Sequence, residues 1–216
     1  MKNMRNYLLK IILTVPAILV AFTVQGYARA LVADKLGDKT PRFQGRLTLN
    51  PAAHIDPLGF IMILLVHFGW TKPVDTNPSA YKRGYKDSIK VSIAAPLGNL
   101  ITGFIFAFIW ALWSNMFKSM SSEFCEIGGR MLFYVCIINV NLFIFNLLPL
   151  PGLAGFDILR DLWPKTYYKV ADTIYQYQVL ILLGVVLVAS EIISIPSTLI
   201  CSLFTKIAFS VVGIFF

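Results

Sequence analysis

Few side chains in this sequence could do chemistry, and their spacing does not match a familiar catalytic set. The only two histidines are His54 and His67, and Asp56 is the nearest carboxylate to His54. Spacings of two residues (His54 to Asp56) and thirteen residues (His54 to His67) do not make a usual metal-binding pattern. The sequence has no Gly-x-Ser-x-Gly motif, no glycine loop for phosphate and no Cys-x-x-Cys pair. We therefore expect His54 to bond to nearby backbone and His67 to be an interior histidine.

A second group of polar side chains lies inside apolar segments. Gln25 and Arg29 are four residues apart, which places them on one face of a helix. A charged side chain in a membrane segment is costly and usually has a partner, although Arg29 could instead extend to the membrane surface. Asn139, Asn141 and Asn146 share another apolar stretch, where amides often bond across helices.

The elements that must position these residues are membrane helices. The 216-residue chain is 57% hydrophobic and only 14% charged, which predicts an all-α integral membrane protein and one domain over residues 1–216. We expect about five to six transmembrane helices and a short re-entrant segment at 57–69. The basic N-terminal residues lead into an apolar stretch that we expect to be a retained transmembrane helix rather than a cleaved signal peptide. The long apolar stretches are 7–33, 91–117, 130–150, 177–194 and 197–216.

Basic residues predict the orientation. Nine Lys and Arg residues lie between 34 and 90, whereas the 118–130 loop has only Lys118 and Arg130. The positive-inside rule then places 34–90 in the cytoplasm, although the basic N-terminus would lie outside. The net charge of +8 therefore indicates topology, and we predict no nucleic-acid partner.

Several stretches in order resemble the site-2 protease family, the intramembrane zinc metalloproteases. The resemblance is strongest over 20–160 and implies a site-2-protease-like core. It rests on residues 21–38 around Gln25-Gly26-Tyr27-Ala28-Arg29, on 46–59 (RLTLNPAAHIDPLG), on 70–78 (WTKPVDTNP), on 94–100 (AAPLGNL) and on 145–155 (FNLLPLPGLAG).

The resemblance implies a zinc site whose chemical groups are replaced in this chain. Family members carry His-Glu-x-x-His and a later Asp, in which the histidines and the Asp bind zinc and the Glu is the general base. Here Gln25, Gly26, Arg29 and Ala154 stand at those positions. We therefore predict no catalytic residue, no metal and no cofactor, and a protein that is not an enzyme. The alternative is an active intramembrane zinc metalloprotease with a non-standard metal site.

The same resemblance suggests what the remodelled site contains. Many family members carry a basic residue where this chain has Asp157, so we predict an ion pair between Arg29 and Asp157. The region of the three asparagines helps to hold substrate in such proteases, so Asn139, Asn141 and Asn146, with His54 and Asp56, are candidates for a groove that binds a partner. Helix packing is the alternative for the asparagines, and framework roles are the alternative for His54 and Asp56.

The predicted function is a catalytically inactive homologue that binds or scaffolds a partner transmembrane segment or a membrane complex. It would be a multi-pass protein of a bacterial or archaeal plasma membrane, in contact with the lipid bilayer. A transporter or channel subunit is a weaker alternative, because inverted repeats and buried acidic relays are missing.

Overall fold

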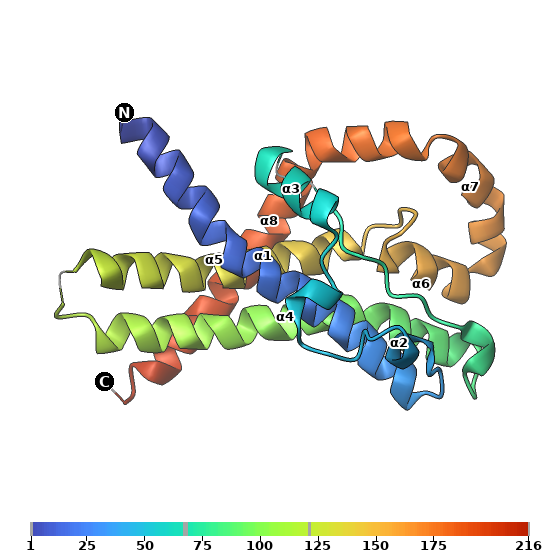
Figure 1. Ribbon diagram of the computed structural model, residues 1–216, viewed down its shortest axis with the longest axis horizontal. Helices are drawn as coiled ribbons and strands as arrows, with labels where there is room; N and C mark the ends of the chain where they lie inside the picture. Colours follow the sequence, from blue (N-terminus) through green and yellow to red (C-terminus); the bar gives the residue numbers. More distant parts are fainter. Residues whose placement is uncertain (1, 67–68, 121, 216) are drawn as a thin grey trace.

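The computed structural model describes residues 2–66, 69–120 and 122–215, and the regular elements among them are helical. This confirms the predicted all-α fold (Figure 1). The elements are α1 (Lys2–Lys35), α2 (Thr40–Phe43), the 3-10 turn η1 (Pro51–Ala53), α3 (Pro57–Val66), the 3-10 turn η2 (Pro78–Ala80), α4 (Tyr85–Met116), α5 (Glu123–Asn146), α6 (Ala154–Leu162), α7 (Pro164–Gln176) and α8 (Gln178–Val212).

Four helices in the described part of the chain are long and apolar enough to cross a membrane, where about five to six were expected. They are Ile11–Lys35, Tyr85–Met116, Glu123–Asn146 and Ile193–Val212. The count is lower because the last two apolar stretches form the single helix α8, with Pro196 inside it. A proline between such stretches need not end a helix in a membrane, since neighbouring groups can satisfy the freed carbonyl.

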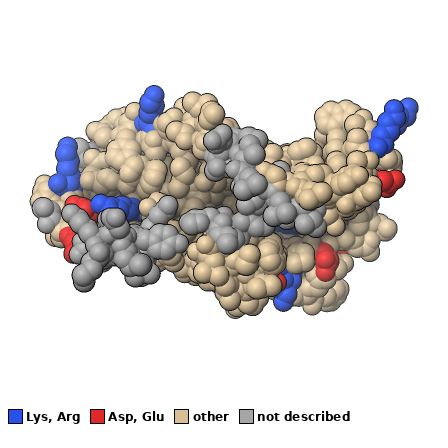
Figure 2. All heavy atoms as spheres, turned by 90° about the horizontal axis from the view of Figure 1, so that it is seen from above, with Lys and Arg blue, Asp and Glu red and all other residues tan. Residues whose placement is uncertain are grey.

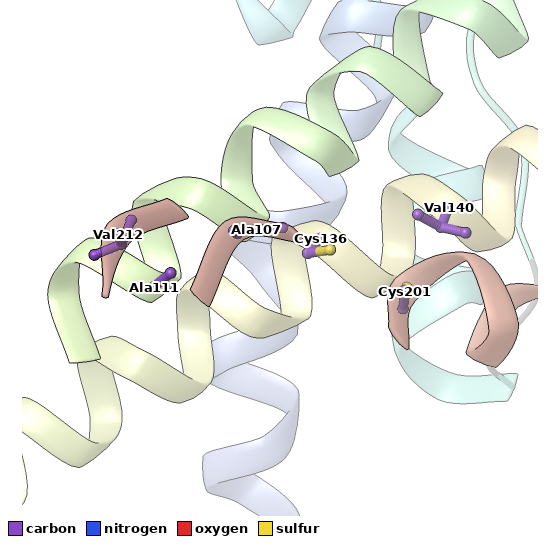
Figure 3. Close-up of a cluster of buried hydrophobic side chains, with 7 residues drawn as sticks. Ala107, Ala111, Cys136, Val140, Cys201 and Val212 are labelled. Atoms are coloured by element: carbon purple, nitrogen blue, oxygen red, sulfur yellow. The ribbon is translucent and has the colours of Figure 1, made fainter. Parts of the chain in front are cut away.

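Helix α4 is central and packs against α1, α5 and α8. Small residues allow this close approach: a Cβ added to Gly98 would lie 2.8 Å from Ala28 Cβ on α1, and one on Gly103 would lie 2.9 Å from Val140 Cγ2 on α5. Figure 3 shows the core that results, in which side chains of three helices meet. They are Ala107 and Ala111 of α4, Cys136 and Val140 of α5, and Cys201 and Val212 of α8.

The predicted re-entrant segment leaves the bundle and returns to it. Ile55 and Thr71 form an antiparallel bridge, and the Lys72 N–H donates to the His54 carbonyl at 3.0 Å, so the base of the loop is closed. The Asp56 carboxylate accepts from the Gly59 N–H at 2.8 Å and caps the start of α3. His67 lies outside the described residues.

Helices α6 and α7 form an arch from the end of α5 to the start of α8 (Figure 1). The arch is held by aromatic contacts of Phe156 with Tyr167 and Tyr175, at ring-centroid distances of 4.9 and 5.6 Å. On the face in Figure 2, the visible charged side chains lie toward the two ends of the molecule. This distribution, together with the four apolar helices, describes a multi-pass membrane protein.

Candidate functional site

The candidate site lies where α1, the end of α5 and the start of α6 come together. Helix α5 stops at Asn146 because Pro149 and Pro151 follow and cannot continue it. The chain then turns tightly into α6: a Cβ added to Gly155 would overlap the Leu147 carbonyl. Ala154 is therefore buried, at 3% exposure, at the first position of α6.

Gln25 links α1 to α5. Its Oε1 accepts a hydrogen bond from Asn146 Nδ2 at 3.1 Å, and the same nitrogen donates to the Leu142 carbonyl at 2.9 Å. Asn146 is 5% exposed. The two amides therefore form a partly buried hydrogen bond between two membrane helices.

Arg29 lies one helical turn after Gln25 and reaches α6. Its Nη2 is 3.1 Å from Asp157 Oδ2, and the two side chains are 22% and 28% exposed. The other oxygen of Asp157 is 3.3 Å from Arg160 Nη1, and Arg160 Nε donates to Asp161 at 2.9 Å. Arg29 Nε is buried and has no hydrogen-bond partner among the described residues. The structure thus brings Arg29 and Asp157 together within a larger network of alternating charges.

Gly26 is covered by His54. A Cβ added to Gly26 would overlap the imidazole at Nδ1, so the ring occupies the volume that a side chain at position 26 would need. His54 is fully buried, and its Nε2 donates to the Thr48 carbonyl at 2.8 Å, which leaves Nδ1 facing α1 without a hydrogen bond in the described structure. Burial lowers the pKa of His54 below its ordinary value, although the hydrogen bond to Thr48 acts in the opposite direction, and the nearby Arg46 charge adds a smaller lowering.

Of the five residues predicted to line a groove, three lie elsewhere or serve the framework. Asp56 caps α3, and Asn139 is fully buried, with its Nδ2 donating to the Val135 carbonyl at 2.8 Å. The Asn139 side chain lies against Gly103 of α4. Asn141 is half-buried on the same helix. Asn146 is the asparagine that bonds to another helix at the junction.

The four positions that bind zinc or catalyse in the family do not fit zinc here. Zinc is held by Cys, His, Asp or Glu at about 2.0–2.3 Å. Gln25, Gly26, Arg29 and Ala154 include none of these types, and the Arg29 guanidinium adds a positive charge without a lone pair. No group of three or more His, Cys, Asp or Glu that could hold a metal ion is present within residues 2–66, 69–120 and 122–215.

A small apolar groove lies beside α1, immediately before Gln25. Its volume is about 180 Å³, and α1 forms one wall while the segment before η1 forms the other. The lining residues are Leu19, Val20, Thr23, Val24, Leu49 and Pro51. Sequence reasoning missed this groove because its walls are about 25 residues apart in the chain. It also did not predict that Arg160 pairs with Asp157, although their three-residue spacing on the amphipathic α6 was a usable signal.

Comparisons with known proteins agree on one family. The model of "Peptidase family M50" matches residues 8–189. "Putative zinc metalloprotease YwhC" of Bacillus subtilis is 44% identical over 148 residues, which cover 68% of this chain and 67% of that protein. "Putative zinc metalloprotease Rip2" of Mycolicibacterium smegmatis is 26% identical over 77% of this chain and 63% of its own length. No solved structure matches.

These comparisons contradict the prediction that the protein is not an enzyme. The matching family is a family of peptidases, and the Bacillus relative at 44% identity is named as a metalloprotease. The prediction inferred a loss of activity from the replacement of four side chains. That step was wrong because side chains at four positions do not exhaust the groups that can hold a metal or activate water.

Proposed function

This chain belongs to peptidase family M50, the family of the site-2 proteases, and we propose that it receives a transmembrane segment of another membrane protein at the junction of α1, α5 and α6. The observation that carries the proposal is the apolar groove beside α1, whose last lining residue on that helix, Val24, immediately precedes Gln25. Apolar side chains of a bound segment would fill the groove, and its backbone would meet the polar groups that follow.

The polar groups at the junction suit an unwound backbone. The buried Arg29 Nε–H has no acceptor within the described chain, and a carbonyl of the bound segment would supply one. Asn146 Nδ2 already makes two hydrogen bonds, so the groups that a bound backbone could use are the amide NH2 of Gln25 as donor and the side-chain carbonyl of Asn146 as acceptor. The nearby Leu49 is 62% exposed and would contact the same segment.

Photo-crosslinking in the native membrane tests this proposal. A benzophenone amino acid at Leu49 or Val20 should give adducts whose crosslinked peptides map to transmembrane segments of one partner. The matched control is Ile105, which is 49% exposed on α4 and lies outside the groove. Equal yields at Leu49 and Ile105, or adducts with lipid alone, would contradict the proposal.

The second candidate function is zinc-dependent cleavage of the bound segment, which the names of both relatives favour. The metal would need ligands other than the four replaced positions. Elemental analysis of the purified protein tests this, and about one zinc per chain that is lost in His54→Ala would support a non-standard site.

A variant with a rebuilt site provides the positive control for that measurement. Gln25→His and Arg29→His restore two imidazoles one helical turn apart, and Ala154→Asp adds a carboxylate from α6. We expect this triple variant to bind about one zinc per chain, and the double variant that lacks Ala154→Asp to bind less. If the triple variant binds and the parent does not, zinc-dependent cleavage by the parent is excluded.

For orientation, we propose that residues 34–90 face the cytoplasm of a bacterial cell and that the α4–α5 connection lies on the opposite side. The basic residues between α1 and α4 support this, since short cytoplasmic segments carry an excess of Lys and Arg.

A further inference from the structure

A second, more open groove lies at the other end of the bundle, where α4 ends and α5 begins. Its volume is about 630 Å³, within the range of about 300–1,000 Å³ typical of ligand sites. Its walls are aromatic and its rim is charged. The aromatic walls include Trp110, Trp113, Phe117 and Phe133, and the charged rim residues are Glu126 and Arg130.

The aromatic walls are held in place by the helix hairpin itself. Trp113 Nε1 donates to the Cys125 carbonyl at 3.0 Å, and its ring lies 4.5 Å from that of Phe117. Trp110 and Phe133 face each other across the two helices, with ring centroids 4.9 Å apart. The groove is therefore formed before any ligand binds.

The rim presents one negative and one positive charge side by side. Glu126 and Arg130 are one turn apart on α5, their closest atoms are 3.4 Å apart, and their side chains are 71% and 60% exposed. A guanidinium pairs well with phosphate, while a carboxylate beside aromatic faces favours an ammonium group. Both α4 and α5 are candidate membrane spans, so the groove lies where spans end and where Trp is favoured at lipid headgroups.

We propose that this groove binds a phospholipid of the surrounding bilayer whose zwitterionic headgroup carries a phosphate and an amine. The lipid phosphate contacts Arg130, and the ammonium group lies between Glu126 and the indole rings of the two tryptophans. The part of an acyl chain nearest the headgroup lies along Phe133. This site is separate from the α1–α5–α6 junction, to which α4 contributes its opposite end (Figure 1).

The test is native mass spectrometry of the delipidated full chain titrated with phosphatidylethanolamine or phosphatidylglycerol. Phosphatidylethanolamine should bind saturably at one site. Arg130→Gln should weaken that binding about tenfold, as expected for one charge-assisted contact. Glu126→Gln should weaken the binding of phosphatidylethanolamine, because the variant lacks the carboxylate that pairs with the ammonium group. It should strengthen the binding of phosphatidylglycerol, which has no ammonium group and is repelled by the carboxylate. The charge-matched control is Lys118→Gln, which changes a basic residue between α4 and α5 that does not line the groove.

A steric pair of variants checks the groove independently of charge. Gly129→Leu should block binding, since a Cβ there meets Trp110 at 3.7 Å and a longer side chain projects between the rings. Gly184→Leu, at a position with nothing within 4 Å, should leave it unchanged. Unaltered binding in both Arg130→Gln and Gly129→Leu, or equal and unsaturable uptake of both lipids, would overturn the proposal.

Discussion

At the scale of single residues, one ion pair at the junction could be predicted from the sequence, whereas two other contacts there could not. Arg29 and Asp157 could be proposed as partners because both stand at positions of family motifs, and their side chains lie 3.1 Å apart. The bond between Gln25 and Asn146 and the contact between Gly26 and His54 were not foreseen. Each contact depends on how far one segment is shifted along the other, and the spacing of residues on a helix does not determine that shift.

Removing Asp157 should destabilise the protein more than removing an exposed acid. Asp157→Ala leaves the half-buried Arg29 without its carboxylate, so we expect a loss of about 1–3 kcal/mol in unfolding free energy. Glu126→Ala, which breaks an exposed ion pair, should change it by less than about 0.5 kcal/mol. Denaturant unfolding in detergent measures both, and equal effects would show that the Arg29 pair adds no stability.

His54 should make the stability fall as the pH is lowered. Burial holds the pKa of folded His54 below the ordinary value of about 6.5, so the unfolded chain takes up the proton first. The contribution of His54 to the free energy of unfolding should therefore be constant above about pH 7 and decrease as the pH falls below about 6.5. His54→Gln should remove this part of the slope. Parallel pH profiles for parent and variant would mean that His54 does not titrate differently on folding.

At the scale of elements, hydropathy located the helices but not their ends. Helix α5 was predicted as 130–150 and runs from Glu123 to Asn146. It begins earlier because Ser122 caps it, accepting from the Cys125 N–H, although its first turn is polar. The helices α6 and α7 of the arch were not predicted, because both are too short to be found as membrane spans by hydropathy. Aromatic contacts join the two helices, and α6 also packs on α4.

The contact of α1 with the His54 segment leads to a prediction about glycine. Gly26→Ala should destabilise the protein by about 1–3 kcal/mol, because the new Cβ overlaps a ring held in place by Thr48. Gly184→Ala in α8 meets nothing within 4 Å and should instead be neutral or stabilise by up to about 1 kcal/mol. Thermal unfolding of the two variants would contradict this account if Gly26→Ala were the more stable.

At the scale of the whole molecule, the family and the membrane fold could be predicted, whereas the activity could not. The ordered motifs between residues 20 and 160 identified a family whose model matches residues 8–189. The four replaced side chains describe one site, whereas the family model matches residues 8–189 and places the chain in a peptidase family. The assignment of residues 1–216 to one domain stays a prediction.

The proposed orientation can be measured with cysteine labelling on intact cells. The three native cysteines are buried, so they give little background. A membrane-impermeant maleimide should label Lys118→Cys from outside and should reach Lys82→Cys only after the membrane is opened, since both positions are exposed. Labelling of both from the same side would place the two connections together and contradict the topology.

Helix α8 has a consequence for how the protein responds to its membrane. Its 35 residues extend over about 52 Å along the helix, whereas the hydrocarbon of a bilayer is about 30 Å thick. Only Ile193–Val212, about 30 Å long, is a candidate span, and the earlier part of α8 continues beyond the change of direction visible in Figure 1. Hydrophobic mismatch makes the tilt of such a span depend on bilayer thickness. Because α6 and α7 lead directly into α8, a change in bilayer thickness that tilts α8 would also shift α6, the helix that carries Asp157.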